Sequence, residues 1–161
     1  MDGGKDVRKF HQEMPEKATP TQVTDSLRLD NGLSWGDWGP IEYCEDGSFA
    51  TAFQVKDIRH CSSGFVTGMR ANVLEPQGTL GDDVAVKNVQ LACDEGQEVI
   101  TGVIEEEEKI PDGKWSFWSR CSAGSGVCGI EIRYENAGLG DDAGVTNIAM
   151  FCCAFNGTRT N

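Results

Sequence analysis

The stretch Leu80-Gly81-Asp82-Asp83 returns as Leu139-Gly140-Asp141-Asp142, at an offset of 139 − 80 = 59 in position number. The identity continues at the same offset with Val86 and Val145, Asn88 and Asn147, and Cys93 and Cys152. This many matches at one spacing indicate an internal repeat, in which one structural unit is built more than once along the chain.

Around this repeat, apolar and polar residues alternate in short runs, as is typical of strands. The chain has 20 glycines and frequent turn signals, so the sequence predicts an all-β fold with quasi-rotational symmetry. We expect strands at 23–29, 65–74, 84–93, 98–104, 130–135 and 144–153. We also expect a hairpin of 41–44 with 49–56, turning at Glu45-Asp46-Gly47, with Phe49, Thr51, Phe53 and Val55 on one face.

The chain divides into three parts by composition. Residues 1–20 are charged and lack periodicity, which predicts a disordered tail. Residues 21–155 are expected to form a single β domain, and residues 156–161 a short C-terminal tail. Asn156 begins an Asn-Gly-Thr glycosylation sequon, a short signal that agrees with secretion.

The chain is strongly acidic, with a formal net charge of −12. Nucleic acid is therefore not an expected partner, because binding it requires clustered Lys and Arg. No apolar run approaches the ~20 residues of a membrane span, so no membrane insertion is expected. The run Glu105, Glu106, Glu107 and Glu108 is either a docking patch for a basic partner or a solvated tip that prevents edge pairing.

Seven cysteines are present, and no two have Cys-x-x-Cys spacing. A zinc site is therefore poorly supported, and disulfides formed in an oxidising compartment are the better interpretation. The odd number leaves one thiol free or available for a bond between chains.

Two Trp-x-x-Trp pairs stand out, at Trp35 and Trp38 and again at Trp115 and Trp118. We align them as repeat equivalents at an offset of 115 − 35 = 80, whereas Cys61 and Cys121 differ by 121 − 61 = 60. One unit is therefore longer or holds an abbreviated third unit. The four tryptophans are candidates for stacking on sugar rings, and the alternative is that they pack a small β domain.

The paired aspartates invite a catalytic or metal interpretation, but their spacing argues against it. Adjacent strand residues point to opposite faces, and the Gly-Asp-Asp loops offer few of the six to eight oxygens that calcium requires. We interpret Asp82, Asp83, Asp141 and Asp142 as turn-fixing residues, and Asn88 and Asn147 as side chains that hold a turn or sheet edge. No catalytic residue, metal site or cofactor is indicated. A site between sheets using Asp37, Glu42 or Glu131 remains open.

Three segments together resemble the vitelline membrane outer layer protein I family: residues 32–39, residues 75–83 and the closing Phe-Cys-Cys at 151–153. The resemblance covers roughly residues 22–155 and implies a secreted β-prism of Greek-key sheets with pseudo-threefold repeats. Here the Asp-Asp pair occurs twice rather than three times, so one unit is expected to be abbreviated. The resemblance favours three disulfides: Cys61–Cys93, Cys121–Cys152 and Cys128–Cys153. Cys44 is then left over and could link two chains, while a Cys44–Cys93 bond with Cys61 free is the rival.

The resemblance implies a structural protein of an extracellular coat that associates with glycans and with basic proteins such as lysozyme. Two alternatives remain: a lectin-like carbohydrate-binding module, and a weak chito-oligosaccharide transferase or hydrolase. Whether the protein is an enzyme is left open, with the residues favouring a non-catalytic role.

Overall fold

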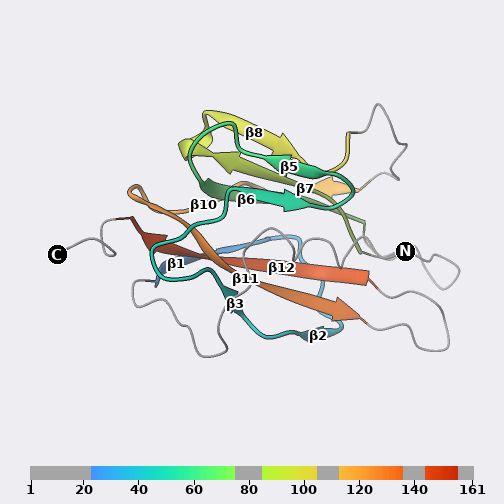
Figure 1. The fold of residues 1–161 in the computed structure, drawn as a ribbon. Helices are drawn as coiled ribbons and strands as arrows, with labels where there is room; N and C mark the ends of the chain where they lie inside the picture. Colours follow the sequence, from blue (N-terminus) through green and yellow to red (C-terminus); the bar gives the residue numbers. More distant parts are fainter. Residues whose placement is uncertain (1–22, 75–84, 105–112, 136–143, 156–161) are drawn as a thin grey trace, which may run out of the picture.

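The computed structural model describes residues 23–74, 85–104, 113–135 and 144–155. Its regular elements are strands, apart from one short 3-10 helix at Asp94–Gly96 (Figure 1). The strands are β1 (Val23–Arg28), β2 (Asp37–Trp38), β3 (Glu42–Tyr43), β4 (Ala52–Gln54), β5 (Ile58–His60), β6 (Val66–Leu74), β7 (Ala85–Cys93), β8 (Glu98–Thr101), β9 (Lys114–Trp115), β10 (Ser119–Arg120), β11 (Ser125–Glu135) and β12 (Gly144–Ala154).

Two five-stranded sheets of the same design dominate the structure. The β11–β12 sheet has the order β1-β12-β11-β2, with β3 also paired to β11. The β6–β7 sheet has the order β8-β7-β6-β10, with β9 also paired to β6. In each, a long antiparallel hairpin carries one short strand on its second strand and two short strands on its first. The two sheets lie one above the other in Figure 1.

The registers of the two long hairpins coincide in detail. A bulge between Val66 and Gly68 in β6 matches one between Val127 and Gly129 in β11. A second bulge lies in the partner strands, opposite the step after Asn72 of β6 and the step after Arg133 of β11, at the same spacing from the first bulge in both hairpins. Bulges are local features that the sequence must encode, so their coincidence shows that the repeat extends to backbone geometry.

The remaining hairpin, β4–β5, repeats part of this design. Ala52 pairs with His60 as Gly68 pairs with Arg120 and Gly129 with Tyr43. β4 therefore corresponds to β6 and β11, and β5 corresponds to β10 and β3. Within the described residues this third sheet has two strands, against five in each of the others.

The core lies between the facing sheets. Because strand side chains alternate between two faces, each long strand sends one row inward. The fully buried members include Leu27, Phe53, Met69, Leu91, Ile130, Ile148 and Met150. Each such side chain contributes about 1.5–3 kcal/mol relative to full exposure, so this shared core accounts for much of the stability of the fold.

Most of the expected strands are present, but the expected hairpin of 41–44 with 49–56 is wrong. The turn at 45–48 does form, with the Ser48 N–H donating to the Glu45 carbonyl over 2.8 Å. However, β3 pairs with β11, and β4 pairs with β5. The expected common face also fails, because Phe53 is buried while Thr51 is exposed. Alternation could not reveal that the chain changes sheets here.

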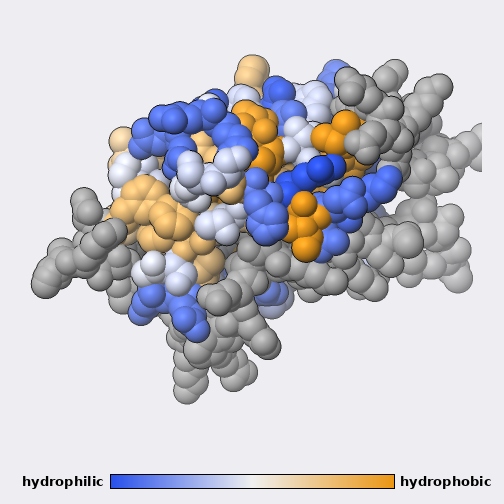
Figure 2. Space-filling model, turned by 45° about the horizontal axis from the view of Figure 1, so that its top comes forward, coloured by the Kyte–Doolittle hydropathy of each residue, from blue (hydrophilic) through white to orange (hydrophobic). Residues whose placement is uncertain are grey.

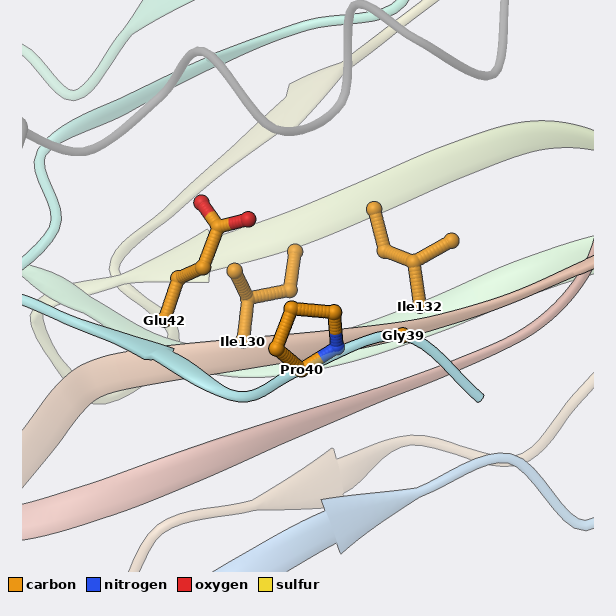
Figure 3. A pocket seen from close by; sticks show the side chains of 5 residues that line it. All are labelled: Gly39, Pro40, Glu42, Ile130 and Ile132. Atoms are coloured by element: carbon orange, nitrogen blue, oxygen red, sulfur yellow. The ribbon is translucent and has the colours of Figure 1, made fainter. Parts of the chain in front are cut away.

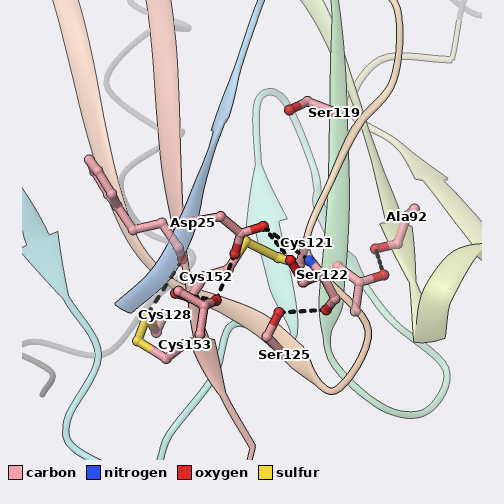
Figure 4. Close-up of a disulfide and its surroundings, with 12 residues drawn as sticks. Asp25, Ala92, Ser119, Cys121, Ser122, Ser125, Cys128, Cys152 and Cys153 are labelled. Carbon is pink, nitrogen blue, oxygen red and sulfur yellow. Dashed lines mark hydrogen bonds between the residues drawn. A yellow bond between two sulfur atoms is a disulfide. The ribbon is translucent and has the colours of Figure 1, made fainter. Parts of the chain in front are cut away.

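Three disulfides join the elements: Cys61–Cys93, Cys121–Cys152 and Cys128–Cys153. These are the pairs that the family resemblance favours, and they exclude the rival Cys44–Cys93 bond. Beside Cys121, the Asp25 carboxylate accepts hydrogen bonds from the N–H and hydroxyl of Ser122 (3.0 and 3.1 Å), which ties β1 to the loop after β10 (Figure 4).

Candidate functional site

Two arginines and two tryptophans alternate on the outer face of the β6–β7 sheet. The Arg70 guanidinium lies 4.7 Å from the Trp115 ring centroid and 5.2 Å from that of Trp118, and the Arg120 guanidinium lies 4.9 Å from Trp118. We call Arg70, Trp115, Trp118 and Arg120 the Arg–Trp ladder. Such cation–π contacts hold the guanidinium planes and rings in fixed positions.

Strand pairing places these side chains. Asn72 pairs with Trp115 and Gly68 with Arg120, so Arg70, between Asn72 and Gly68 on β6, shares their outward face. Gly68 has no side chain, so the Arg120 side chain can lie against the backbone of β6. A Cβ at position 68 would lie 3.4 Å from Arg120 Cγ.

Hydrogen bonds extend the ladder across the sheet. Arg70 Nε donates to Gln90 Oε1 over 2.7 Å, and Gln90 Nε2 donates to Thr101 Oγ1 over 3.1 Å. The Nε edge of the Arg70 guanidinium is thus fixed by Gln90. A rigid, planar donor next to an aromatic surface is suited to hydroxyl-rich or anionic groups of a sugar chain.

The other two tryptophans lie apart from the ladder. Trp38 is on the β11–β12 sheet, where Arg133 lies 5.9 Å from its ring centroid and donates through Nε to the Gly36 carbonyl over 3.0 Å. Trp35 is 39% exposed, and its carbonyl accepts a hydrogen bond from Thr146 Oγ1 over 2.8 Å. The structure therefore brings Trp115 and Trp118 together and does not join all four.

The alignment of the two Trp-x-x-Trp pairs is wrong. Trp38 pairs with Arg133 on β11, and Trp115 pairs with Asn72, the β6 counterpart of Arg133. Trp38 therefore corresponds to Trp115, at an offset of 115 − 38 = 77 in position number. Cys44, the cysteine that follows β3, has the same offset of 77 from Cys121. The two similar Trp-x-x-Trp motifs misled the alignment because they suggest a different offset.

The repeated asparagines both contact backbone at turns. Asn88 Oδ1 accepts from the N–H groups of Val89 and Val103, and its Nδ2 donates to the Val103 carbonyl, each over 2.9 Å. Asn147 Oδ1 accepts from the Ile148 N–H over 2.9 Å, and its Nδ2 reaches the Leu33 carbonyl at 3.4 Å. Both side chains hold the strand beside their own hairpin.

A small pocket opens between β11 and the β2–β3 segment (Figure 3). It is lined by Gly39, Pro40, Glu42, Ile130 and Ile132. Glu42 pairs with the buried Ile130, and both side chains point to the same side. Glu42 is the one carboxylate in this lining, whereas glycoside hydrolysis uses two, about 5 to 9.5 Å apart. Asp37 and Glu131 do not line the pocket.

The side of the molecule that carries β5 and β8 shows apolar side chains as separate groups among polar ones (Figure 2). Ile58 of β5 and Val99 of β8 are among the exposed apolar residues. Arg59 lies between Ile58 and His60, and its NH2 group is 3.8 Å from an Asp57 carboxylate oxygen.

Cys44 is the single free cysteine, and it is buried, with 4% of its surface exposed. Burial raises the pKa of its thiol from 9.0 to about 11, because the thiolate is poorly solvated there. A disulfide between two chains through Cys44 would require this region to open.

Several expected sites lie outside the described residues. They are the turn residues Asp82, Asp83, Asp141 and Asp142, the acidic run Glu105–Glu108, and the sequon residue Asn156. Among the described residues, no helix has the length and apolar character required to cross a membrane.

Comparison with known proteins identifies the family of this chain. Residues 55–155 match the model of the vitelline membrane outer layer protein I family. The chain belongs to the vitelline membrane outer layer protein I family. A vitelline membrane outer layer protein 1 homolog from Mus musculus is 34% identical over 129 residues, covering 77% of this chain and 54% of the mouse protein. The chain thus spans about half the length of that relative.

A second vitelline membrane outer layer protein 1 homolog, from Homo sapiens, is 28% identical over 177 residues, covering 81% of this chain and 83% of the human protein. Because 81% of 161 residues is about 130, the human alignment includes about 47 positions that this chain does not fill. Among solved structures, the V. cholerae biofilm matrix protein Bap1 aligns with a TM-score of 0.46 at 10% identity, covering 90% of this chain and 26% of that one. Family membership and the three disulfides indicate an extracellular protein.

Proposed function

We propose that this protein is a secreted structural component of an extracellular coat, and that it holds glycans on the Arg–Trp ladder of the β6–β7 sheet. The family relationship supports a protein of the vitelline membrane outer layer type. We further propose that residues 21–155 form one domain, a β-prism of Greek-key sheets with a pseudo-threefold axis and one abbreviated unit. The matching registers of the three hairpins support this arrangement.

The observation that carries glycan binding is the position of Arg70 between Trp115 and Trp118. Its charge is delocalised over a plane that is already oriented by the Gln90 side chain, so little conformational entropy is lost on binding. On a chain with a net charge of −12, two adjacent arginines form a local cationic surface. Anionic glycans are therefore expected to bind more tightly than neutral ones of the same length.

The acidic surface supports the second part of the proposal, association with basic proteins such as lysozyme. Long-range attraction brings a cationic partner near, and many exposed pairs then hold it weakly, at about 0.2–1 kcal/mol each. Such a complex is expected to dissociate as salt is raised. An enzymatic role for the Glu42 pocket is not proposed, because its lining supplies one carboxylate.

The test is titration of immobilised glycans, covering neutral chito-oligosaccharides and sulfated chains of equal length. Wild type, Arg70→Ala and Arg120→Ala are compared with Arg133→Ala, which removes the guanidinium beside Trp38 on the other sheet. The proposal expects loss of binding in the two ladder variants and retention in the control. Equal binding by all four proteins would place any glycan site elsewhere.

A further inference from the structure

Phe117 is the most exposed large apolar residue in the described part of the chain, at 82%, and Ile58 follows at 57%. It lies in the short connection between β9 and β10, next to Trp118 of the Arg–Trp ladder. A single exposed apolar side chain is ordinary on a protein surface. Phe117 differs from such a residue in two ways: its backbone is held in place, and cationic side chains lie beside it.

Hydrogen bonds hold the backbone of Phe117 on both sides. Its N–H donates to Asp30 Oδ1 over 3.1 Å, and its carbonyl accepts from the Ser116 hydroxyl over 2.9 Å. Ser116 is buried, and its N–H and Oγ pair with the carbonyl and N–H of Ala71 over 2.8 and 3.1 Å. A ring carried by a backbone constrained in this way loses little conformational entropy when a ligand covers it.

Cationic side chains lie on both sides of Phe117 along the chain. Lys114 and Arg120 are exposed on the strands before and after it. Arg70 lies between the two tryptophans of the ladder. The chain as a whole has a net charge of −12, so this region differs from the overall charge of the protein. The local charge favours an anionic ligand.

The equivalent region of the β11–β12 sheet has acidic residues instead. Trp115 and Trp38 hold equivalent positions against the first long strand, and so do Gly68 and Gly129 at its first bulge. Counted from these, three pairs of residues correspond: Lys114 and Asp37, Phe117 and Pro40, and Arg70 and Glu131. The fold that both units share therefore requires neither the cations nor the exposed ring, which are particular to the β6–β7 sheet.

The two tryptophans of the ladder are less suited than Phe117 to stack on a sugar ring. The guanidinium groups of Arg70 and Arg120 lie 5.2 and 4.9 Å from the Trp118 ring centroid. Arg70 also lies 4.7 Å from the Trp115 centroid. A sugar ring on either tryptophan would compete with these cation–π contacts, whereas the Phe117 ring is open to solvent.

We propose that Phe117 is the platform on which one ring of an acidic glycan stacks, while Arg70 and Arg120 bind the sulfate or carboxylate groups of the same chain. A pyranose ring with mostly equatorial substituents presents C–H groups on its face, and these pack against an aromatic ring. This inference rests on the proposed glycan binding, and it adds to the ladder a contact that recognises the sugar ring rather than its charge.

A protein is the less favoured ligand for Phe117. A stable protein interface covers about 800 Å² on each partner and is centred on clustered apolar anchors. The exposed residues next to Phe117 through the chain or its hydrogen bonds are instead charged, namely Asp30, Lys114 and Arg120. One aromatic ring within a charged surrounding suits a sugar, which has an apolar face and a polar edge.

The test compares three probes: a neutral chito-oligosaccharide, the same chain sulfated, and inorganic polyphosphate of matching charge, which has no ring to stack. Phe117→Ala should weaken both sugar chains about three- to tenfold and leave polyphosphate binding unchanged. Arg70→Ala should weaken the sulfated chain and polyphosphate. Because the Phe117 side chain is 82% exposed, Phe117→Ala should keep the melting temperature of the wild type.

Two conservative variants separate the aromatic ring from its apolar character. Phe117→Tyr keeps the flat face and should keep the affinity for both sugar chains, whereas Phe117→Leu should lose it as Phe117→Ala does. Ile58→Ala removes another exposed apolar side chain and should bind like the wild type. With 4-fluorophenylalanine at position 117, the fluorine resonance should shift on addition of either sugar chain and not with polyphosphate.

Unchanged affinity for both sugar chains in Phe117→Ala, or in Phe117→Leu, would overturn the inference. If Arg70→Ala loses the sulfated chain in that experiment, the proposed glycan binding stands and only the stacking role fails. If Arg70→Ala also binds like the wild type, the proposed function fails as well. Weaker binding of lysozyme, with sugar binding intact, in Phe117→Ala would overturn the inference and assign the ring to a protein partner.

Discussion

Asn88 and Val103 are joined by a reciprocal pair of hydrogen bonds: Val103 N–H to Asn88 Oδ1 and Asn88 Nδ2 to Val103 O, both 2.9 Å. The Asn88 side chain is almost fully buried, so neither bond is exchanged for water at low cost. Asn88 thereby fixes the chain just beyond β8 against β7. Its repeat counterpart Asn147 has a longer and less buried contact with Leu33.

From this difference we expect unequal effects of removing the two side chains. Asn88→Ala should lower the free energy of unfolding by about 2–4 kcal/mol, because it leaves the Val103 N–H and carbonyl unpaired. Asn147→Ala should cost about 1–2 kcal/mol. Urea denaturation at fixed pH measures both. A loss at Asn147 equal to that at Asn88 would contradict this assignment.

The disulfides give a second prediction. Cys61–Cys93 closes a loop with a sequence separation of 32, and Cys121–Cys152 one of 31. A loop of that length is expected to contribute about 3–4 kcal/mol by restricting the unfolded chain. The double variants Cys61→Ala with Cys93→Ala, and Cys121→Ala with Cys152→Ala, should therefore lose similar amounts in denaturation experiments. A loss at one pair several times that at the other would show that strain or packing outweighs loop closure.

The Cys44 thiol gives a prediction about alkaline pH. Its folded pKa is about 11 against 9.0 for the free group, so below pH 9 the thiol is protonated in both states and does not affect stability. Between pH 9 and 11 the unfolded chain loses this proton first, and stability falls as pH rises, by about 1.4 kcal/mol per pH unit at most. Cys44→Ser should lack this slope. Identical stability curves for the two proteins from pH 8 to 10.5 would refute the effect.

The ladder can be tested without complete loss of charge. Arg70→Lys keeps a cation but cannot hold both the Gln90 contact and the stacking on Trp115. We expect affinity for sulfated glycans to fall about three- to tenfold in Arg70→Lys and more in Arg70→Ala, with fold stability changed by less than about 1 kcal/mol. Calorimetric titration with parallel melting curves separates the two quantities. Full affinity in Arg70→Lys would mean that charge alone is recognised.

Two glycines with positive φ form a matched pair. Gly36 has φ +89°, and a Cβ there would lie 2.7 Å from the Tyr134 carbonyl oxygen. Gly124 has φ +81°, but a Cβ there would meet no atom within 4 Å. Gly124→Ala should cost about 1 kcal/mol for the backbone conformation alone. Gly36→Ala should cost clearly more, because rigid backbone must also move, and equal melting temperatures would rule this out.

The family and the strands could be anticipated from the sequence because each depends on local pattern or on recurring residues. The cysteine pairing followed from the family resemblance. The alternation in 130–135 and 84–93 encodes which side chains face inward, and the repeat around Asn88 and Asn147 encodes two like hairpins. The acidic balance likewise follows from composition alone. In contrast, the predicted hairpin of 41–44 with 49–56 is wrong, since strands of two and three residues carry too little periodicity to specify a sheet.

Only the tertiary structure decided which tryptophans lie together and which short strands hold equivalent positions in the different sheets. Arg70 and Trp115 are far apart in the sequence, and their contact exists because β9 pairs with β6. The equivalence of Cys44, Cys61 and Cys121 appears in backbone hydrogen bonds that three different sheets make, not in a common sequence motif. Local alternation fixes the face of a strand, but the choice of neighbouring strand depends on packing across the whole chain, and that choice places the ladder.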